Sequence, residues 1–66
     1  SDLSEIISLS FIAKHYFGKT KEWLYQRING NVVNGKPCRF TAEELDRFNH
    51  ALKDISQKIG SLRLSY

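Results

Sequence analysis

Two consecutive segments decide the fold of this chain: Leu9-Ser-Phe-Ile-Ala-Lys-His-Tyr-Phe-Gly18 and Lys19-Thr-Lys-Glu-Trp-Leu-Tyr-Gln-Arg-Ile-Asn-Gly30. Apolar residues recur in both segments at the spacing of a short helix. Each segment ends in glycine, which readily adopts the left-handed backbone conformation found at helix C-termini. Two short helices joined by a tight glycine turn have the layout of a helix-turn-helix.

Both helices have a predicted start. Ser10 is expected to cap a helix over residues 11–17, and Thr20 to cap one that ends at Asn29, because their hydroxyls accept hydrogen bonds from first-turn amides. Leu24 and Ile28 lie four residues apart and should face the core. The sequence therefore predicts a helix-turn-helix over residues 10–30, preceded by a frayed turn or short helix over residues 1–8.

The outer face of the second helix carries side chains of the kind that contact DNA. Gln26 and Asn29 have the geometry to pair with adenine, and Arg27 with guanine or a phosphate. Lys19, Lys21 and the free amides at the helix start would hold phosphates, assisted by the helix dipole. The alternative is a polar helix exposed to water with no ligand. The residues predicted to bind nucleic acid are Lys19, Thr20, Lys21, Glu22, Tyr25, Gln26, Arg27, Asn29, Lys36 and Arg39.

The charge is concentrated in the middle of the chain. The 66 residues carry a formal net charge of +3. Within residues 14–39 six bases stand against one acid, a local balance of +5. A basic region around a recognition helix is expected of a DNA-binding protein, although an ordinary solvated surface can also be basic. The six bases are Lys14, Lys19, Lys21, Arg27, Lys36 and Arg39, and the acid is Glu22.

Residues 31–40 contain a turn signal. Asn34-Gly35 favours a two-residue hairpin turn, and an irregular linker is the open alternative. Pro37 has no amide hydrogen, so a long strand ladder is not expected. A hairpin would place Lys36 and Arg39 to touch backbone phosphates.

The last helix has the clearest start. Thr41-Ala-Glu-Glu44 is a capping box, which predicts a helix from about 42 to 59 within the segment 41–60 and a tail over residues 61–66. An apolar stripe follows at alternating steps of three and four residues. We expect the stripe to cover the helix-turn-helix within one chain, and the alternative is that it pairs two copies as a protein-interaction module. The stripe residues are Leu45, Phe48, Leu52, Ile55 and Ile59.

Several classes of function are not expected. A single domain of this length has no room for a deep catalytic cleft. Cys38 is the one cysteine, and His15 and His50 are isolated, so neither a metal site nor a catalytic site is predicted. No apolar run approaches the ~20 residues of a membrane span. The sequence thus predicts a cytoplasmic protein that is not an enzyme and has no cofactor, small-molecule substrate or membrane partner.

Residues 9–30 resemble the helix-turn-helix of the phage-repressor (lambda-repressor-like) proteins. The Ile-Ala-Lys step, the glycine turn and the Asn-Gly ending carry the resemblance, and Leu24 and Gly30 keep that family's spacing. The interval from Ala13 to Gly18 is one residue longer than usual. Nearly the whole chain also resembles a family of short uncharacterised bacterial proteins from gut anaerobes, with a suspected DNA-binding core, and that resemblance implies no site residues.

Together these patterns predict one all-α domain over residues 1–66. It has three to four helices, a helix-turn-helix and, as an option, a short hairpin after the second main helix. The expected function is sequence-specific binding of duplex DNA, as a transcription regulator or a mobile-element accessory protein. A homodimer or a protein-interaction module that uses the apolar stripe of the last helix is the alternative.

Overall fold

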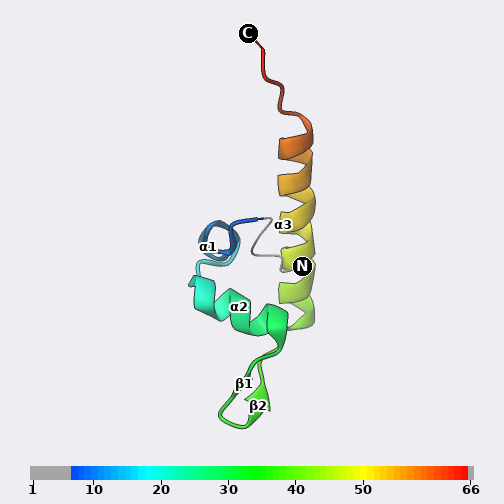
Figure 1. The fold of residues 1–66 in the computed structure, drawn as a ribbon. Coiled ribbons are helices and arrows are strands. Elements are labelled where there is room, and N and C mark those ends of the chain that lie inside the picture. Colours follow the sequence, from blue (N-terminus) through cyan, green and yellow to red (C-terminus); the bar gives the residue numbers. More distant parts are fainter. Residues whose placement is uncertain (1–6, 66) are drawn as a thin grey trace.

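The computed structural model describes residues 7–65, which form a mostly helical domain with one small antiparallel hairpin. Figure 1 shows the first two helical segments on one side of the long last helix, with the hairpin beyond them at the lower end. The turn or short helix expected over residues 1–8 lies outside the described residues, except for its last two positions. In chain order the elements are α1 (Leu9–Ile12), η2 (Ala13–Phe17), α2 (Lys21–Asn29), β1 (Val32–Val33), β2 (Lys36–Pro37) and α3 (Ala42–Gly60).

The first helix begins two residues earlier than predicted. Ser8, rather than Ser10, is the N-cap: its backbone is extended and its hydroxyl accepts from the Phe11 amide at 3.2 Å. The earlier start brings Leu9 onto the same face as Ile12, and both are buried. Burial of Leu9 therefore favours the Ser8 cap, although both serines are chemically suited to the position.

The first helix closes with a wide π-helical turn, η2, which the sequence analysis did not predict. The Lys19 amide donates to the Ala13 carbonyl at 2.9 Å, a span of six residues. At the end of α2 the corresponding bond, from the Asn31 amide to the Gln26 carbonyl at 2.9 Å, spans only five. Gly18 takes the left-handed conformation at φ 64°, as predicted. Its closing turn therefore holds one residue more than the usual helix ending.

The second helix and the hairpin follow their local signals. Thr20 caps α2 by accepting from the Trp23 amide at 3.2 Å, and Gly30 ends it at φ 63°. Asn34 and Gly35 have φ values of 53° and 78°, the positive values that a type I′ hairpin turn requires. All four residues of β1 and β2 are exposed, so the hairpin projects from the body.

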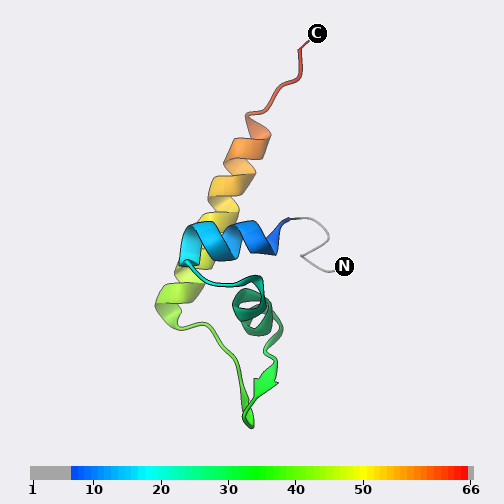
Figure 2. The ribbon, with the colours of Figure 1, turned by 90° about the vertical axis from the view of Figure 1, so that its left-hand side faces the viewer.

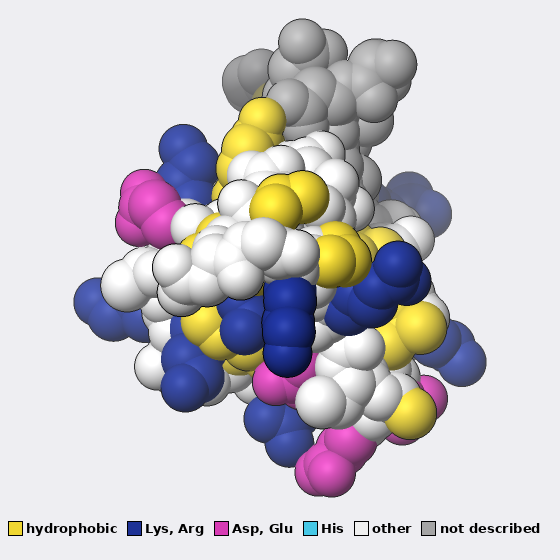
Figure 3. Space-filling model, turned by 90° about the horizontal axis from the view of Figure 1, so that it is seen from below, with side chains coloured by type: hydrophobic (Ala, Val, Ile, Leu, Met, Phe, Trp, Pro, Cys, Tyr) yellow, Lys and Arg dark blue, Asp and Glu magenta, His cyan; other side chains and the backbone are white. Residues whose placement is uncertain are grey.

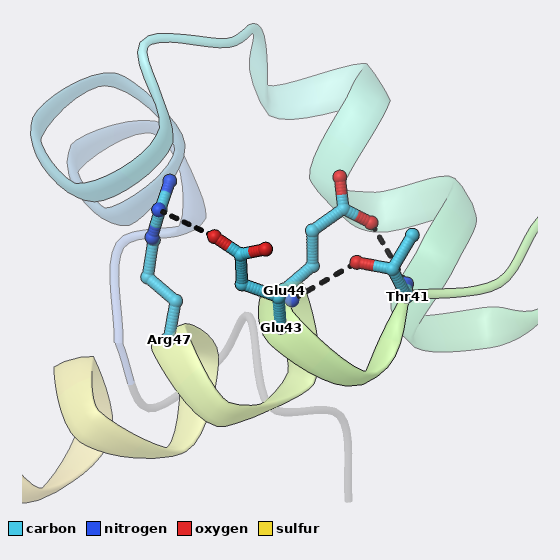
Figure 4. A network of polar contacts seen from close by, with 4 residues as sticks. All are labelled: Thr41, Glu43, Glu44 and Arg47. Atoms are coloured by element: carbon cyan, nitrogen blue, oxygen red, sulfur yellow. Dashed lines mark hydrogen bonds and ion pairs between the residues drawn. The ribbon is translucent and has the colours of Figure 1, made fainter.

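The capping box at the start of α3 is present as predicted. The Thr41 hydroxyl accepts from the Glu44 amide at 3.1 Å, and the Glu44 carboxylate accepts from the Thr41 amide at 2.9 Å (Figure 4). Glu43 and Arg47 form an exposed ion pair at 3.9 Å one turn further on. The local hydrogen bonds thus fix where α3 begins, independently of tertiary packing.

The core is small and lies between α1, η2 and α2 on one side and the first half of α3 on the other. In Figure 2 α1 and η2 cross α3, with α2 beside them. Aromatic rings in stacked, tilted or edge-on contact extend the core, with centroid separations between 5.2 and 6.3 Å. The buried residues are Leu9, Ile12, Ala13, Leu24, Phe48 and Ala51, and the aromatic rings are those of Phe17, Trp23, Phe40 and Phe48.

The apolar stripe of α3 divides into a packed middle and exposed ends. Phe48 is 7% exposed, and Leu52 and Ile55 pack half-buried against the core. Leu45 is 48% exposed and Ile59 is 59% exposed. Only the middle of the stripe therefore packs against α1, η2 and α2. The second half of α3 projects past them at one end and the hairpin extends the other end (Figure 1), so the molecule is 54 Å long and 20 to 23 Å across.

Candidate functional site

A groove with three lysines lies at the start of α2. It has a volume of about 610 Å³ and is lined from three successive elements by Ser10, Lys14, Gly18, Lys19, Thr20, Lys21 and Trp23. We call it the lysine groove. All three lysines are exposed, so their ammonium groups can reach a ligand in the groove. The capping of α2 by Thr20 leaves the first backbone amides of the helix pointing toward the same end.

The structure brings Lys19 and Lys21 together as the sequence analysis expected, and it adds one residue that was missed. Lys14 was counted as part of the basic region but not as a site residue. It belongs to η2, whose extra residue carries the chain around to the same groove as the start of α2. The signal in the sequence was the one-residue surplus between Ala13 and Gly18.

The outer face of α2 is partly open. Glu22 and Asn29 are exposed, and Tyr25 is 38% exposed. The Asn29 side-chain amide donates to the Tyr25 carbonyl at 3.0 Å, which holds it against the helix. Gln26 is half-buried rather than fully turned outward. The exposed polar face of α2 is therefore narrower than the outer face that the helical periodicity of the sequence predicted.

Arg27 has a structural contact that the sequence analysis did not foresee. Its guanidinium carbon lies 4.1 Å from the centre of the Trp23 ring, and Nη1 donates to the Trp23 carbonyl at 3.1 Å. Its Nε is buried without a hydrogen-bond partner among the described residues. Arg27 therefore stacks on Trp23, and one of its five guanidinium N–H groups is bonded to the helix backbone.

The two remaining predicted bases lie around the hairpin. Lys36 is exposed in β2, and Arg39 is exposed just after it. Arg39 and Arg27 line a second groove of about 430 Å³ between the end of α2 and the start of α3. Figure 3 shows Lys and Arg side chains spread over this end of the molecule, with acidic and hydrophobic side chains between them. Of the ten predicted residues, Lys19, Thr20 and Lys21 line the lysine groove and Arg27, Asn29 and Arg39 line the second groove, whereas the other four line neither.

A hydrogen bond joins two titratable side chains, Tyr16 on η2 and Asp54 on α3. The Tyr16 hydroxyl donates to Asp54 Oδ2 at 2.6 Å, and Lys58 Nζ lies 3.2 Å from the same oxygen. The hydrogen bond from Tyr16, followed by that from Lys58, lowers the pKa of Asp54. The same bond to Asp54 raises the pKa of Tyr16. These shifts come from a tie between η2 and α3 outside the lysine groove, so they mark a structural contact.

Further features of the described part of the chain concern metal binding, membrane insertion and the single thiol. Between residues 7 and 65 no three His, Cys, Asp or Glu side chains gather closely enough to hold a metal ion. In the same range no helix combines the length and the apolar character that a membrane span needs. Cys38 is a free, half-buried thiol after the hairpin.

The described residues define a class of protein: a small, mostly helical domain with a two-stranded hairpin and a basic groove at the start of its second α-helix. The chain belongs to the family described as "Domain of unknown function (DUF5053)", whose model matches residues 1–66. The comparison with curated proteins found no match. The comparison with solved structures found none either.

Proposed function

We propose that this domain binds duplex DNA through a helix-turn-helix formed by α1, η2 and α2. The lysine groove is the observation that carries the proposal. Three exposed ammonium groups, from Lys14, Lys19 and Lys21, surround the N-terminal end of α2. Backbone amides and the positive end of the helix dipole favour an anion at such an end. A DNA phosphate has the matching charge.

The geometry of the turn supports a helix-turn-helix with one additional residue. The resemblance to lambda-repressor-like proteins leaves one residue too many between Ala13 and Gly18. The π-helical turn η2 absorbs a residue at this position, because its closing bond from Lys19 to Ala13 spans six residues. Gly18, in the left-handed conformation at φ 64°, then ends η2 ahead of α2. The additional residue is therefore compatible with two helices that pack against each other.

We assign separate roles to the two ends of α2. At its start, the lysine groove would hold phosphates and set the position of the helix on the duplex. On the outer face of α2, the exposed Tyr25 and Asn29 and the half-buried Gln26 would contact the major groove, where amide side chains pair with adenine. The hairpin would add phosphate contacts through Lys36 and Arg39. Arg27 would support Trp23 rather than read a base, because its guanidinium lies over the indole ring and donates from Nη1 to the Trp23 carbonyl.

Fluorescence anisotropy with labelled duplex DNA over a series of salt concentrations tests the proposal. We expect binding at low salt that weakens linearly on a log-log plot as salt increases. The double variant Lys19→Ala, Lys21→Ala should weaken binding and reduce the salt slope by about 2, since each phosphate contact contributes about 0.9.

Lys53→Ala controls for the loss of a lysine elsewhere, because Lys53 is exposed on α3 outside the lysine groove. Its slope should remain that of the wild type. The proposal would be rejected by no binding to duplex DNA at low salt, or by equal losses of affinity in the control and the double variant. A structured RNA in a parallel series identifies the ligand class. Tighter binding to that RNA than to the duplex would also reject the proposal.

A further inference from the structure

The hairpin of β1 and β2 projects from the body next to α2. Figures 1 and 2 both show it beyond α2, on the side that faces away from α1. Its four strand residues are exposed, and so are Asn34 and Gly35 at its tip. A duplex that meets α2 from the side that α1 leaves uncovered therefore also meets the hairpin.

We propose that the tip of this hairpin enters the minor groove of the bound duplex and that Asn34 selects A·T pairs there. The inference rests on the proposed function, because it concerns the same DNA complex. In the minor groove A·T pairs present only acceptors, whereas a G·C pair adds the amino group of guanine. The side-chain amide of Asn34 donates to the acceptors, and the guanine amino group projects from the floor of the groove and obstructs the tip.

The dimensions of the hairpin fit this groove. From residue 31 at its base to residue 34 at its tip the strand rises about 10 Å, at about 3.3 Å per residue. The minor groove of B-DNA is about 7.5 Å deep and about 6 Å wide, so the hairpin is long enough to reach the floor. Only the tip is narrow enough to enter, because Gly35 has no side chain.

The hairpin is held in one conformation before any ligand binds. At its base the Cys38 amide donates to the Asn31 carbonyl at 2.7 Å. Bonded and non-bonded pairs alternate along an antiparallel ladder, so Val32 and Pro37, the next pair toward the tip, form a non-bonded pair. Pro37 thus lacks an amide hydrogen where the ladder needs none. A preformed tip loses little conformational entropy when it enters the groove.

The charge and the exposed side chains of this segment match DNA. Residues 23–42 contain the bases Arg27, Lys36 and Arg39 and no acid. Val33 lies opposite Lys36 in the hairpin, so their side chains share one face, and Val33 is 42% exposed. An aliphatic side chain beside a cation suits the deoxyribose and phosphate of one strand at the rim of the groove. The strongly negative potential of a narrow A·T minor groove also attracts Lys36.

The role of Asn34 in the turn can be separated from its role in the groove. Asparagine is favoured at this position because it tolerates a positive φ, which is 53° here. Glycine tolerates a positive φ equally well and has no amide to donate. Asn34→Gly should therefore keep the turn and remove the proposed contact with the base, and circular dichroism would verify the fold.

Binding to two duplexes that differ only in the minor groove tests the inference. The first is the duplex that binds most tightly from a random-sequence pool, and the second has 2,6-diaminopurine in place of every adenine. Diaminopurine adds an amino group in the minor groove and leaves the donors and acceptors of the major groove unchanged. The wild type should bind the second duplex about tenfold or more weakly, and Asn34→Gly should reduce this ratio below about threefold.

Asn31→Ala is the matched control, because Asn31 is an exposed asparagine at the base of the hairpin. It should keep the ratio of the wild type. Asn34→Asp is a second variant that suits the turn, and it should bring the ratio close to one because a carboxylate cannot donate to the acceptors.

The outcomes distinguish this inference from the proposed function. No binding to any duplex at low salt would overturn both. Equal binding of the wild type to the two duplexes would overturn the inference alone, and so would a ratio that Asn34→Gly leaves unchanged. The binding of α2 in the major groove would then stand without a contact from the hairpin tip in the minor groove.

Discussion

The Tyr16 hydroxyl donates to Asp54 Oδ2 at 2.6 Å, a contact between residues 38 positions apart that ties η2 to α3. Six apolar residues are buried in the described part of the chain, and this hydrogen bond adds a polar contact between two elements that pack around them. It also makes the stability of the fold depend on pH at both ends of the scale.

The sign of that dependence follows from the pKa shifts. The pKa of Asp54 is lowered from the ordinary 3.8 in the folded chain, so its contribution to stability is present above that value and is lost as the pH falls through the folded pKa. The pKa of Tyr16 is raised from 10.0, so its contribution is present below that value and is lost as the pH rises through the folded pKa. Tyr16→Phe should therefore flatten the stability profile at both extremes.

Urea unfolding at a series of pH values measures this effect. The wild type should lose more stability than Tyr16→Phe between about pH 5 and pH 3. Tyr25→Phe is the matched control, because Tyr25 is exposed on α2 and lies outside the contact with Asp54. An acid profile that is the same for the wild type and Tyr16→Phe would contradict the assigned role of the hydrogen bond.

Gly18 and Gly60 provide a matched pair of substitutions. A Cβ at either position would meet nothing within 4 Å, so steric crowding is equal. Gly18 has a φ of 64°, whereas Gly60 is the last residue of α3. We expect Gly18→Ala to lower the free energy of unfolding by about 1 kcal/mol through backbone strain. Gly60→Ala should leave it unchanged or raise it by about 0.5 kcal/mol.

Thermal and urea unfolding at low protein concentration would measure both variants without a contribution from self-association. Equal effects at the two positions would show that the left-handed turn after η2 is not needed for the fold. A loss confined to Gly18→Ala would indicate that the bend between η2 and α2 is a fixed feature.

The capping box of α3 should contribute measurably to stability. Thr41→Ala removes the acceptor for the Glu44 amide and should cost about 1 kcal/mol. Glu44→Gln should cost less, because a glutamine oxygen can still accept from the Thr41 amide. Glu43→Gln removes only the exposed ion pair with Arg47 and should change the free energy of unfolding by less than about 0.5 kcal/mol. A different order of these three effects in urea unfolding would contradict the assignment.

Local signals in the sequence predicted most of the element boundaries. The caps at Thr20 and Thr41, the glycine stops at Gly18 and Gly30 and the Asn34-Gly35 turn depend on residues within a few positions of one another, so they are visible in the sequence. The first helix was misplaced because two serines were equally suited as caps. The choice between Ser8 and Ser10 depends on burial of Leu9, which is a tertiary property.

The candidate site was less predictable for the same reason. The position of Arg27 on the helix suggested a base contact, but its place over Trp23 depends on where the indole ring packs. The even repeat of the α3 stripe gave no sign that its middle is packed and that Ile59 is exposed. The apolar stripe of α3 does not by itself show how far along α3 the other helices extend. The lysine groove is lined from α1, η2 and α2, and no signal in the sequence pointed directly to the π-helical turn among them.

Substitution of Lys14 tests most specifically whether the π-helical turn η2 takes part in DNA binding. It lies on η2, outside α2, yet it lines the lysine groove with Lys19 and Lys21. If the groove holds a phosphate, Lys14→Ala should weaken binding to every duplex by a similar factor and reduce the salt slope by about 1. Asn29→Ala, on the exposed face of α2, should instead weaken binding in a sequence-dependent way and leave the slope unchanged.

Binding of both variants to one preferred duplex and one unrelated duplex, measured over the same salt series, separates these outcomes. Lys53→Ala controls for the loss of one positive charge, since Lys53 is exposed on α3 outside the groove. A slope for Lys14→Ala equal to that of Lys53→Ala would show that Lys14 makes no phosphate contact. The additional residue in η2 would then serve only to close the helix, and the phosphate contacts would be confined to α2 and the hairpin.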